Sequence, residues 1–320
     1  MSSSGTPQRT ILITGCSSGC GRDAALALRD RGWRVFAACR KQADCNELKA
    51  LGFDSPRIDY QEESSIDSGF DEVMAATGGT LDALYNNGAY SMRGAVEDVP
   101  TDALRAMFEA NFFGWHHLTA KTVKVMRKQG EHGRGHIIQH SSGFGMVSGA
   151  FNSCYCATKF ALEAHSQALR QELFDTDIKV VLLNTGLIKT SIREKSRVPY
   201  NRWIAPVVET SYFRTYYRQV IEPRLFGPYV PDKNEEQVDS VTRKVIAALE
   251  TSSPPVRYYI TFLIWKLAVA VRLFPSALVD KLYLQALTGK KLHGRASAHT
   301  ALHPQAPADP DEDTCAPKKD

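Results

Sequence analysis

The sequence predicts an α/β fold, a doubly wound parallel sheet with helices on both faces. Short apolar runs alternate with helical segments across roughly residues 10–260, a pattern typical of parallel strands linked by helical crossovers. A glycine-rich turn follows the first run, and polar side chains follow several later runs. Because parallel strands bring their carboxyl ends to one edge of the sheet, we expect these polar groups to form one ligand site there.

We expect about seven strands in the spatial order 3-2-1-4-5-6-7. The predicted strands are residues 10–13, 34–38, 57–60, 81–85, 136–140, 179–183 and 256–260. The predicted helices are the segment after Gly21 up to Arg29, then residues 43–51, 64–77, 101–128, 153–174 and 235–249. A single domain is predicted over residues 9–290, between a flexible segment at 1–8 and a disordered tail at 291–320.

Composition narrows the class of protein. With 43% hydrophobic and 23% charged residues among 320, the chain has the balance of a soluble globular protein. The net charge of +4 is spread along the chain and indicates no nucleic-acid partner. The first ten residues are polar and the seven cysteines include no C-x-x-C pair, so we expect a cytoplasmic protein with reduced thiols. No histidine spacing indicates a metal site.

The glycine-rich turn lies between a predicted strand and a predicted helix. It reads Thr14-Gly15-Cys16-Ser17-Ser18-Gly19-Cys20-Gly21. Glycines at such a turn let the backbone approach a pyrophosphate, which the helix N-terminus then binds. This context favours a dinucleotide site over the alternative, a plain turn between a strand and a helix.

The end of the second predicted strand bears on which dinucleotide binds. Folds that bind NAD(H) carry an acidic residue about 20 positions after the glycines, but counting 20 from Gly19 reaches Cys39. Arg40 comes next, and a guanidinium suits the 2′-phosphate of NADP(H). We therefore expect NADP(H) to be preferred over NAD(H); the alternative is that Arg40 is a solvated surface residue. Asp59, near the end of the third predicted strand, is expected to contact the adenine.

A catalytic arrangement is predicted around Tyr155 and Lys159, which lie about one helical turn apart on one face. We expect the phenol to donate a proton, because an adjacent cation lowers its pKa. Ser142, thirteen residues upstream at a strand end, would add a hydroxyl, with Ser141 as the alternative. Asn111 is unexpected inside a long helix; it either serves the site or caps a kink in that helix.

Several of these residues occur in an order and spacing that mark a known family. They are Thr14-Gly15-x-x-x-Gly19-x-Gly21, Asn86-Asn87, Asn111, Ser142 and Tyr155-x-x-x-Lys159. With them the chain resembles the short-chain dehydrogenase/reductase family over about residues 9–260, which implies a single-domain Rossmann fold. Residues 39–41 and 151–163 resemble the branch that holds 17β-hydroxysteroid and retinol dehydrogenases, and also bacterial NADP-dependent aldehyde reductases. The chain departs from the family pattern at two loops, Gly88-Ala89 and Thr185-Gly186.

The resemblance implies a role for each of these residues. Tyr155 would be the general acid in reduction and the general base in oxidation. Lys159 would lower the Tyr155 pKa and bind the nicotinamide ribose, while Ser142 would hydrogen-bond the substrate oxygen. Asn111 would hold a water that relays protons to Lys159. The implied cofactor-binding set is Gly15, Ser17, Ser18, Gly19, Cys20, Gly21, Arg40, Asp59, Asn86, Asn87, Gly88, Tyr155, Lys159, Gly186 and Thr190.

After the sixth predicted strand the alternation stops, and residues 191–232 are rich in Tyr, Trp and Phe. The family places a helical substrate lid here, so we expect an apolar substrate such as a steroid, a retinoid or a fatty aldehyde. The alternative is ordinary packing of extra helices. We interpret Arg193, Lys195, Arg197 and Arg202 as a solvated basic face, with an anion site as the alternative.

Residues 261–290 are predicted to form C-terminal helices. The apolar run there is too short to cross a membrane and is interrupted by Lys266 and Arg272. It would cover the mouth of the site, form a dimer face or contact a membrane surface through residues 261–287, and all three alternatives stay open. The resemblance implies a homodimer or homotetramer formed by helices 101–128 and 153–174.

The sequence therefore predicts an NADP(H)-dependent oxidoreductase that interconverts an apolar aldehyde or ketone and its alcohol, with Tyr155 as acid and base. The alternative is a dinucleotide-binding regulator or scaffold without turnover. Such a protein would need residues 15–21 but not Tyr155, so the complete catalytic set favours the enzyme.

Overall fold

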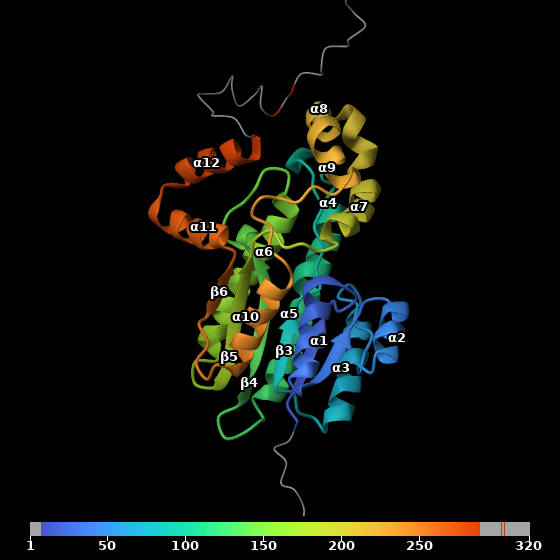
Figure 1. Cartoon of the computed structure of the whole chain (residues 1–320), viewed down its shortest axis with the longest axis vertical. Helices are drawn as coiled ribbons and strands as arrows, with labels where there is room; N and C mark the ends of the chain where they lie inside the picture. The colour runs from blue at the N-terminus through green and yellow to red at the C-terminus, as the bar shows by residue number, and fades with distance from the viewer. Residues whose placement is uncertain (1–7, 289–301, 303, 305–320) are drawn as a thin grey trace, which may run out of the picture.

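The computed structural model describes residues 8–288 together with Leu302 and Pro304. Its centre is a parallel sheet in the order β2-β1-β3-β4-β5-β6 (Figure 1). The strands are β1 (Thr10–Thr14), β2 (Arg34–Ala38), β3 (Ala83–Asn86), β4 (Arg134–Ser142), β5 (Asp177–Thr185) and β6 (Arg257–Ile260). Neighbouring strands pair in parallel throughout, so their carboxyl ends share one edge. The predicted doubly wound α/β class is confirmed.

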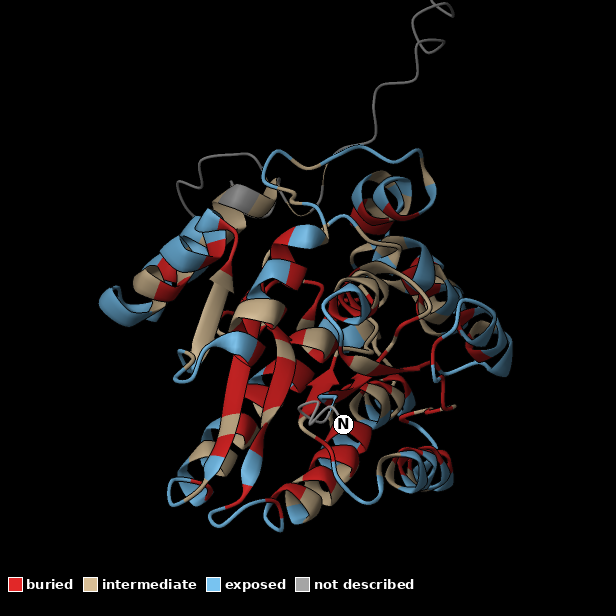
Figure 2. Ribbon diagram, turned by 60° about the horizontal axis from the view of Figure 1, so that its bottom comes forward, coloured by how far each residue is buried: buried red, intermediate tan, exposed pale blue. Residues whose placement is uncertain are grey.

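Helices cover both faces of this sheet (Figures 1 and 2). One layer consists of α1 (Gly19–Asp30), α2 (Gln42–Ala50) and α10 (Asp239–Glu250), and the other of α3 (Glu63–Thr77), α5 (Gly114–Met126) and α6 (Ser153–Glu172). Along β1, Ile11 and Ile13 belong to the first core cluster and Leu12 to the second. Side chains alternate between faces along a strand, so a strand that is apolar on both faces must lie between two helical layers.

The predicted strand at residues 57–60 does not form, so the sheet has six strands within the described range instead of seven. Two isolated parallel bridges, Phe36 with Asp54 and Cys39 with Arg57, run along the outer side of β2 in its place. Pro56 has no N–H to donate to a ladder. The Ser55 hydroxyl instead donates to the Ala37 carbonyl at 2.6 Å, which ends regular pairing at this edge.

The predicted helix at 101–128 is divided into three parts. They are α4 (Thr101–Phe108), a π-helical segment η2 (Glu109–Phe113) and α5. Single π-helical turns are uncommon inside α-helices and frequently occur at functional sites. The buried Asn111 lies at the centre of this segment.

The lid region forms a series of short helices. They are α7 (Ile192–Trp203), the 3₁₀ helix η4 (Ala205–Thr210), α8 (Arg214–Tyr216), the π-helical segment η5 (Tyr217–Ile221) and α9 (Glu222–Phe226). Their buried side chains form a third core cluster with α4, the loop after β3 and Phe151. This cluster lies above the carboxyl edge of the sheet (Figure 1).

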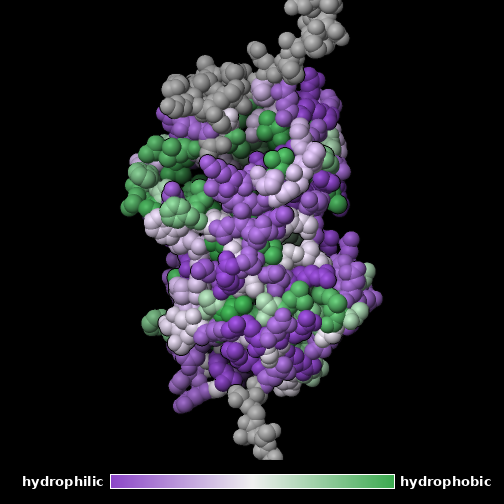
Figure 3. Space-filling model, in the orientation of Figure 1, coloured by the Kyte–Doolittle hydropathy of each residue, from purple (hydrophilic) through white to green (hydrophobic). Residues whose placement is uncertain are grey.

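Two C-terminal helices, α11 (Phe262–Leu273) and α12 (Ser276–Thr288), stand on the other side of that edge (Figure 1). Figure 3 shows hydrophobic surface gathered over them. Phe262, Trp265 and Leu273 are more than half exposed, whereas Ile264 is buried against the glycines at the site. Among the described residues no helix combines the length and hydropathy of a membrane span. The predicted segments 1–8 and 291–320 lie outside the described residues apart from Gln8, Leu302 and Pro304.

Candidate active site

The predicted catalytic residues converge where β4 ends and α6 begins. Ser142 is the last residue of β4, and Tyr155 and Lys159 lie in the first two turns of α6. The Ser142 side chain hydrogen-bonds the Tyr155 phenol, and its oxygen also accepts from the Phe144 amide at 3.2 Å. Ser141 is only 1% exposed, and its hydroxyl has no partner among the described residues. The structure therefore brings Ser142, and not Ser141, to Tyr155.

The pKa of Tyr155 shifts in the direction opposite to the sequence-based expectation. Burial raises the pKa of its phenol to about 12, and the hydrogen bond with Ser142 opposes that rise. Lys159 does not determine the direction of this pKa shift. Its ammonium donates to the His140 carbonyl at 2.7 Å and lies 5.7 Å from the centre of the Tyr155 ring. At neutral pH the phenol is protonated and able to act as an acid.

Lys159 is almost fully buried. Burial lowers the pKa of its ammonium to about 7, with Glu163 opposing the change. The ammonium lies 4.4 Å above the Trp115 ring, a cation–π contact that offsets part of its lost hydration. A lysine with a pKa near neutrality can take up and release protons at physiological pH.

Asn111 joins the π-helical segment to the rest of the site. Its side-chain oxygen accepts from the Tyr90 amide at 3.1 Å, and its nitrogen donates to the Tyr90 carbonyl at 2.9 Å. The same nitrogen donates to the Thr158 hydroxyl at 3.3 Å, one residue before Lys159. The side chain therefore ties the loop after β3 to α6 and does not cap its own helix.

The glycine-rich loop has the geometry that a dinucleotide needs. Gly15 and Gly19 have φ angles of 69° and 62°, a conformation that other residues rarely adopt. A Cβ on Gly15 would lie 2.7 Å from the Gly88 Cα, and one on Gly21 would lie 2.7 Å from the Gly15 carbonyl. Ser18 makes no side-chain cap at the start of α1, and the first turn carries no acidic residue. Open amides at this helix end fit a bound pyrophosphate.

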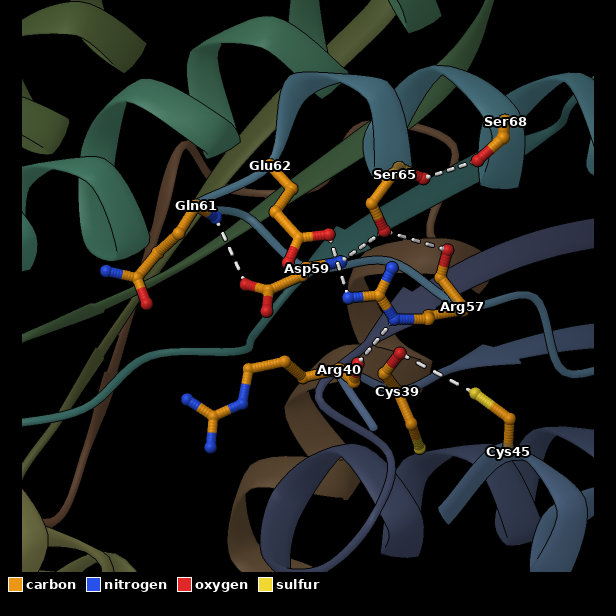
Figure 4. Close-up of polar contacts among 9 residues, drawn as sticks. All are labelled: Cys39, Arg40, Cys45, Arg57, Asp59, Gln61, Glu62, Ser65 and Ser68. Atoms are coloured by element: carbon orange, nitrogen blue, oxygen red, sulfur yellow. Dashed lines mark hydrogen bonds and ion pairs between the residues drawn. The ribbon is translucent and has the colours of Figure 1, made fainter. Parts of the chain in front are cut away.

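Arg40 follows the buried Cys39 at the end of β2 (Figure 4). Its guanidinium makes no hydrogen bond or ion pair with any described residue, whereas the neighbouring Arg57 pairs with Glu62 at 2.8 Å. Asp59 accepts a hydrogen bond from the Gln61 amide at 3.1 Å in a local turn. Beside the end of β2, the guanidinium of Arg40 is thus open to an anionic ligand, whereas that of Arg57 is not.

The two asparagines after β3 differ in what they contact. Asn86 is fully buried, and its side chain accepts from Tyr60 and donates to Thr119 and Gln139, so it faces the core. Asn87 donates to the Thr14 carbonyl at 3.0 Å and so holds the end of β3 against the glycine loop. The Gly88 carbonyl accepts from the Trp115 indole at 2.8 Å.

The start of the lid lies over the glycine loop. The Thr190 methyl would be 3.2 Å from a Cβ on Gly19, and Gly186 donates to the Ile260 carbonyl at 3.2 Å. The Ser18 hydroxyl lies 3.0 Å from that of Ser191 and accepts from the Lys195 ammonium at 2.7 Å. The lid and the glycine-rich loop are therefore joined by side-chain hydrogen bonds.

Two residues at the site are absent from the predicted set. His140 Nδ1 lies 2.7 Å from the Tyr85 hydroxyl and 3.0 Å from Asn87 Oδ1, and burial lowers its pKa to about 3. Trp115 contacts both Gly88 and Lys159. The position of His140, directly before Ser141-Ser142 at a strand end, was a usable signal; nothing local distinguished Trp115 from a core residue.

Comparison with known proteins accounts for this geometry. Residues 9–201 match the family of short chain dehydrogenases. The chain belongs to the short-chain dehydrogenase family. It is therefore an oxidoreductase acting on CH–OH and carbonyl groups, with a nucleotide-cofactor site of the kind that this family shares.

Three relatives cover most of this short-chain dehydrogenase. It is 35% identical to the uncharacterized oxidoreductase YbbO of Escherichia coli strain K12 over 86% of this chain and 94% of the relative. It is 30% identical to the NADPH-dependent 3-dehydrocapnine reductase of Ornithobacterium rhinotracheale over 89% and 98% of the two chains. A crystal structure of a short-chain dehydrogenase from Streptomyces avermitilis superposes with a TM-score of 0.66 and 25% identity over 87% and 97% of the two chains.

Proposed function

We propose that this short-chain dehydrogenase is an NADP(H)-dependent carbonyl reductase or alcohol dehydrogenase for apolar aldehydes, ketones and alcohols. Steroids, retinoids and fatty aldehydes are the substrate types, as in the branch of 17β-hydroxysteroid and retinol dehydrogenases. The observation that carries the proposal is the contact between Ser142 and Tyr155 beside the buried Lys159. A hydroxyl, a protonated phenol and a titratable ammonium at one edge suit proton transfer to an alkoxide oxygen.

Each residue of this group has a distinct part in the reaction. When bound, NADPH supplies the hydride that reduces the carbonyl carbon. Ser142 would donate a hydrogen bond to the carbonyl oxygen and favour the negative charge that develops there. The Tyr155 phenol would then give its proton to that oxygen, and its raised pKa keeps it protonated until this step. Lys159 would bind the nicotinamide ribose and return a proton to Tyr155, with Asn111 holding a water for that relay.

The cofactor preference is proposed from the charges around the adenosine end. Residues 15–21 would hold the pyrophosphate, and the guanidinium of Arg40 would bind the 2′-phosphate. The NADPH dependence of the 3-dehydrocapnine reductase supports the same preference. Arg40→Ala should therefore weaken NADPH binding about tenfold and leave NADH binding unchanged, as measured by fluorescence titration. Equal use of NADH and NADPH by the wild-type enzyme would contradict the preference.

The apolar character of the substrate is proposed from the lid. Tyr216 and Tyr217 from the lid surround Phe151, which lies four residues before Tyr155. Such rings beside the catalytic helix suit a ligand with an extended apolar part.

The decisive experiment is a screen of NADPH oxidation over aldehydes, retinoids and steroids of graded chain length. Tyr155→Phe should reduce turnover by about 100-fold or more and leave NADPH affinity unchanged, because only the proton donor is removed. Unchanged turnover in Tyr155→Phe would refute the proposed mechanism. Binding of NADPH without turnover on any carbonyl compound would instead favour the alternative, a regulator or scaffold.

The oligomeric state is proposed to be a homodimer or homotetramer. Phe113, next to α5, and Phe160, on α6, are 49% and 42% exposed on the segments for which pairing is expected. Light scattering of the purified chain tests this, and the double substitution Phe113→Ser with Phe160→Ser should shift the oligomeric state toward the monomer.

Liposome flotation of the wild type against Phe262→Ser with Trp265→Ser tests whether α11 contacts a membrane surface.

A further inference from the structure

The loop after β3 places Arg93 next to the segment that leads into the catalytic helix. The amide of the adjacent Gly94 donates to the Phe151 carbonyl at 2.9 Å, and Gly94 also forms an isolated bridge with Asn152. Tyr155 lies three residues after Asn152. The position of Arg93 is therefore held relative to the catalytic phenol by backbone contacts.

Arg93 experiences the charges of side chains from two other parts of the chain. Tyr216 and two arginines come from the lid region, Tyr283 comes from α12, and all of them interact electrostatically with the Arg93 guanidinium. Tyr283 packs against Phe144 with ring centres 6.2 Å apart, and Phe144 packs edge-on against Tyr155 at 6.3 Å. Arg93 is thus linked to the catalytic phenol through Tyr283 and Phe144 as well as through the backbone of Gly94.

Arg93 has no counter-ion within the described residues, although it is only partly exposed. The two nearby arginines share a counter-ion: Asp232 pairs with Arg224 at 2.6 Å and lies 3.6 Å from Arg193. Asp232 therefore pairs with two of these three guanidinium groups, which leaves the positive charge of Arg93 unbalanced within the described residues. Burial lowers the pKa of Arg93, and the other two arginines add to that effect. A partly buried cation without a partner is costly unless an anion binds to it.

The surrounding hydroxyls add further donors. Neither Tyr216 nor Tyr283 has a hydrogen-bond partner for its phenol within residues 8–288, and burial raises the pKa of both, so both stay protonated. A guanidinium presents a planar pair of donors that matches the oxygens of a carboxylate, a sulfonate or a phosphate.

We propose that Arg93 binds an anionic group of the substrate, with the phenols of Tyr216 and Tyr283 as additional donors. The inference rests on the proposed carbonyl–alcohol chemistry and sharpens its substrate class. The substrate is an amphiphile, in which one oxyanion group binds at Arg93, the carbonyl binds at Tyr155 and an apolar chain lies against the lid.

The test compares charged and neutral forms of the same carbonyl compound. A series of oxodecanoates with the carbonyl at successive positions, their methyl esters and an oxoalkyl phosphate are assayed by NADPH oxidation. For the best-placed carbonyl, the wild type should favour the charged form over the ester in kcat/KM by about tenfold or more. Arg93→Gln should bring this ratio close to one, and Arg93→Lys should restore part of it.

Arg105→Gln is the matched control, because it removes an exposed guanidinium on α4 and changes the net charge equally. It should keep the wild-type ratio. A ratio that is the same in Arg93→Gln and the wild type, or a wild type that prefers the esters, would overturn the inference. The phosphate arm decides whether carboxylate or phosphate is the better oxyanion.

A binding measurement separates this inference from the proposed reaction. In the presence of NADP⁺, decanoate should bind the wild type about tenfold more tightly than decanol by calorimetry, and Arg93→Gln should abolish the difference. That result with no turnover on any carbonyl would uphold the anion site and refute the proposed reaction. Turnover of neutral carbonyls with equal binding of decanoate and decanol would uphold the proposed reaction and refute the anion site.

Discussion

The ring of Phe151 stacks on that of Tyr216, with centroids 4.5 Å apart and planes 11° from parallel. Phe151 belongs to the segment before α6, and Tyr216 belongs to the lid. The Phe151 backbone has a φ of 61°, which is rare for a bulky residue and requires compensating contacts. The Gly94 amide and the ring of Phe213 supply them. The position of the lid is therefore coupled to that of α6, which carries Tyr155 and Lys159.

Phe151→Ala should loosen this coupling. We expect a loss of about 3–5 kcal/mol of stability, because the buried ring is removed while the unfavourable φ remains. KM for apolar carbonyls should rise more than kcat falls, since the lid would no longer be held over the site. Thermal unfolding and steady-state kinetics measure the two effects. Phe174→Ala, at a position 93% exposed, is the control and should change neither; equal KM values for both variants would refute the coupling.

Gly15 and Gly52 allow a second comparison. Both have positive φ angles, 69° and 84°, but a Cβ would clash with Gly88 only at Gly15, and at Gly52 nothing lies within 4 Å. Gly52→Ala should therefore cost only about 1 kcal/mol, the backbone penalty alone, and leave NADPH affinity unchanged. Gly15→Ala should cost more and weaken NADPH binding by about tenfold or more, because the loop must move away from β3. Urea unfolding and NADPH titration test this, and indistinguishable variants would contradict it.

The order of the strands and the shared edge of the site were predictable because they follow from local patterns and from the rules of parallel sheets. The glycine loop, Arg40, Ser142, Tyr155 and Lys159 all lie at that edge, as alternation and spacing indicated. The third strand was mispredicted because the prediction relied on the apolar pattern of residues 57–60. It did not take account of the missing N–H of Pro56 or of the hydroxyl of Ser55.

The remaining features depend on contacts between segments far apart in the chain. The Tyr155 pKa was expected to fall because Lys159 is close in sequence, but burial, which a spacing does not reveal, raises it. The sequence did not distinguish Arg93 from other loop arginines, because its lack of a counter-ion depends on how the lid and α12 are placed in the fold. The π-helical turn at Asn111 likewise reflects a tertiary contact, the pair of hydrogen bonds with Tyr90.

The buried Lys159 predicts how stability depends on pH. Its pKa is about 7 in the folded protein and about 10.4 in the unfolded chain, so the unfolded state binds more protons between these values. Stability should therefore rise with pH across this window relative to Lys159→Met, by about 4 kcal/mol from pH 7 to pH 10. Urea unfolding of both proteins without cofactor at pH 7, 8, 9 and 10 measures the difference. A difference that stays constant over this range would show that Lys159 is already charged in the folded state.

Lys195 provides the last prediction, because it reaches from α7 in the lid to the cofactor loop. Its ammonium donates to the Ser18 hydroxyl at 2.7 Å. Burial lowers its pKa and the charge of Asp44 opposes that change, while the nearby charges of Arg40 and Lys41 add to it. Three cations and one carboxylate therefore lie near the place where the cofactor phosphates would bind. A phosphate there would relieve this repulsion and hold the lid against the glycine loop at the same time.

Lys195→Met should therefore weaken NADPH binding about tenfold and raise KM for the carbonyl substrate, since both the phosphate contact and the lid contact are lost. NADH binding should weaken less if Lys195 acts on the 2′-phosphate, and equally if it acts on the pyrophosphate, so the pair of titrations locates the contact. Lys124→Met on α5 removes the same charge away from this cluster and should leave both affinities unchanged. Unaltered NADPH affinity in Lys195→Met would mean that Ser18 is its sole partner and that the lid closes independently of the cofactor.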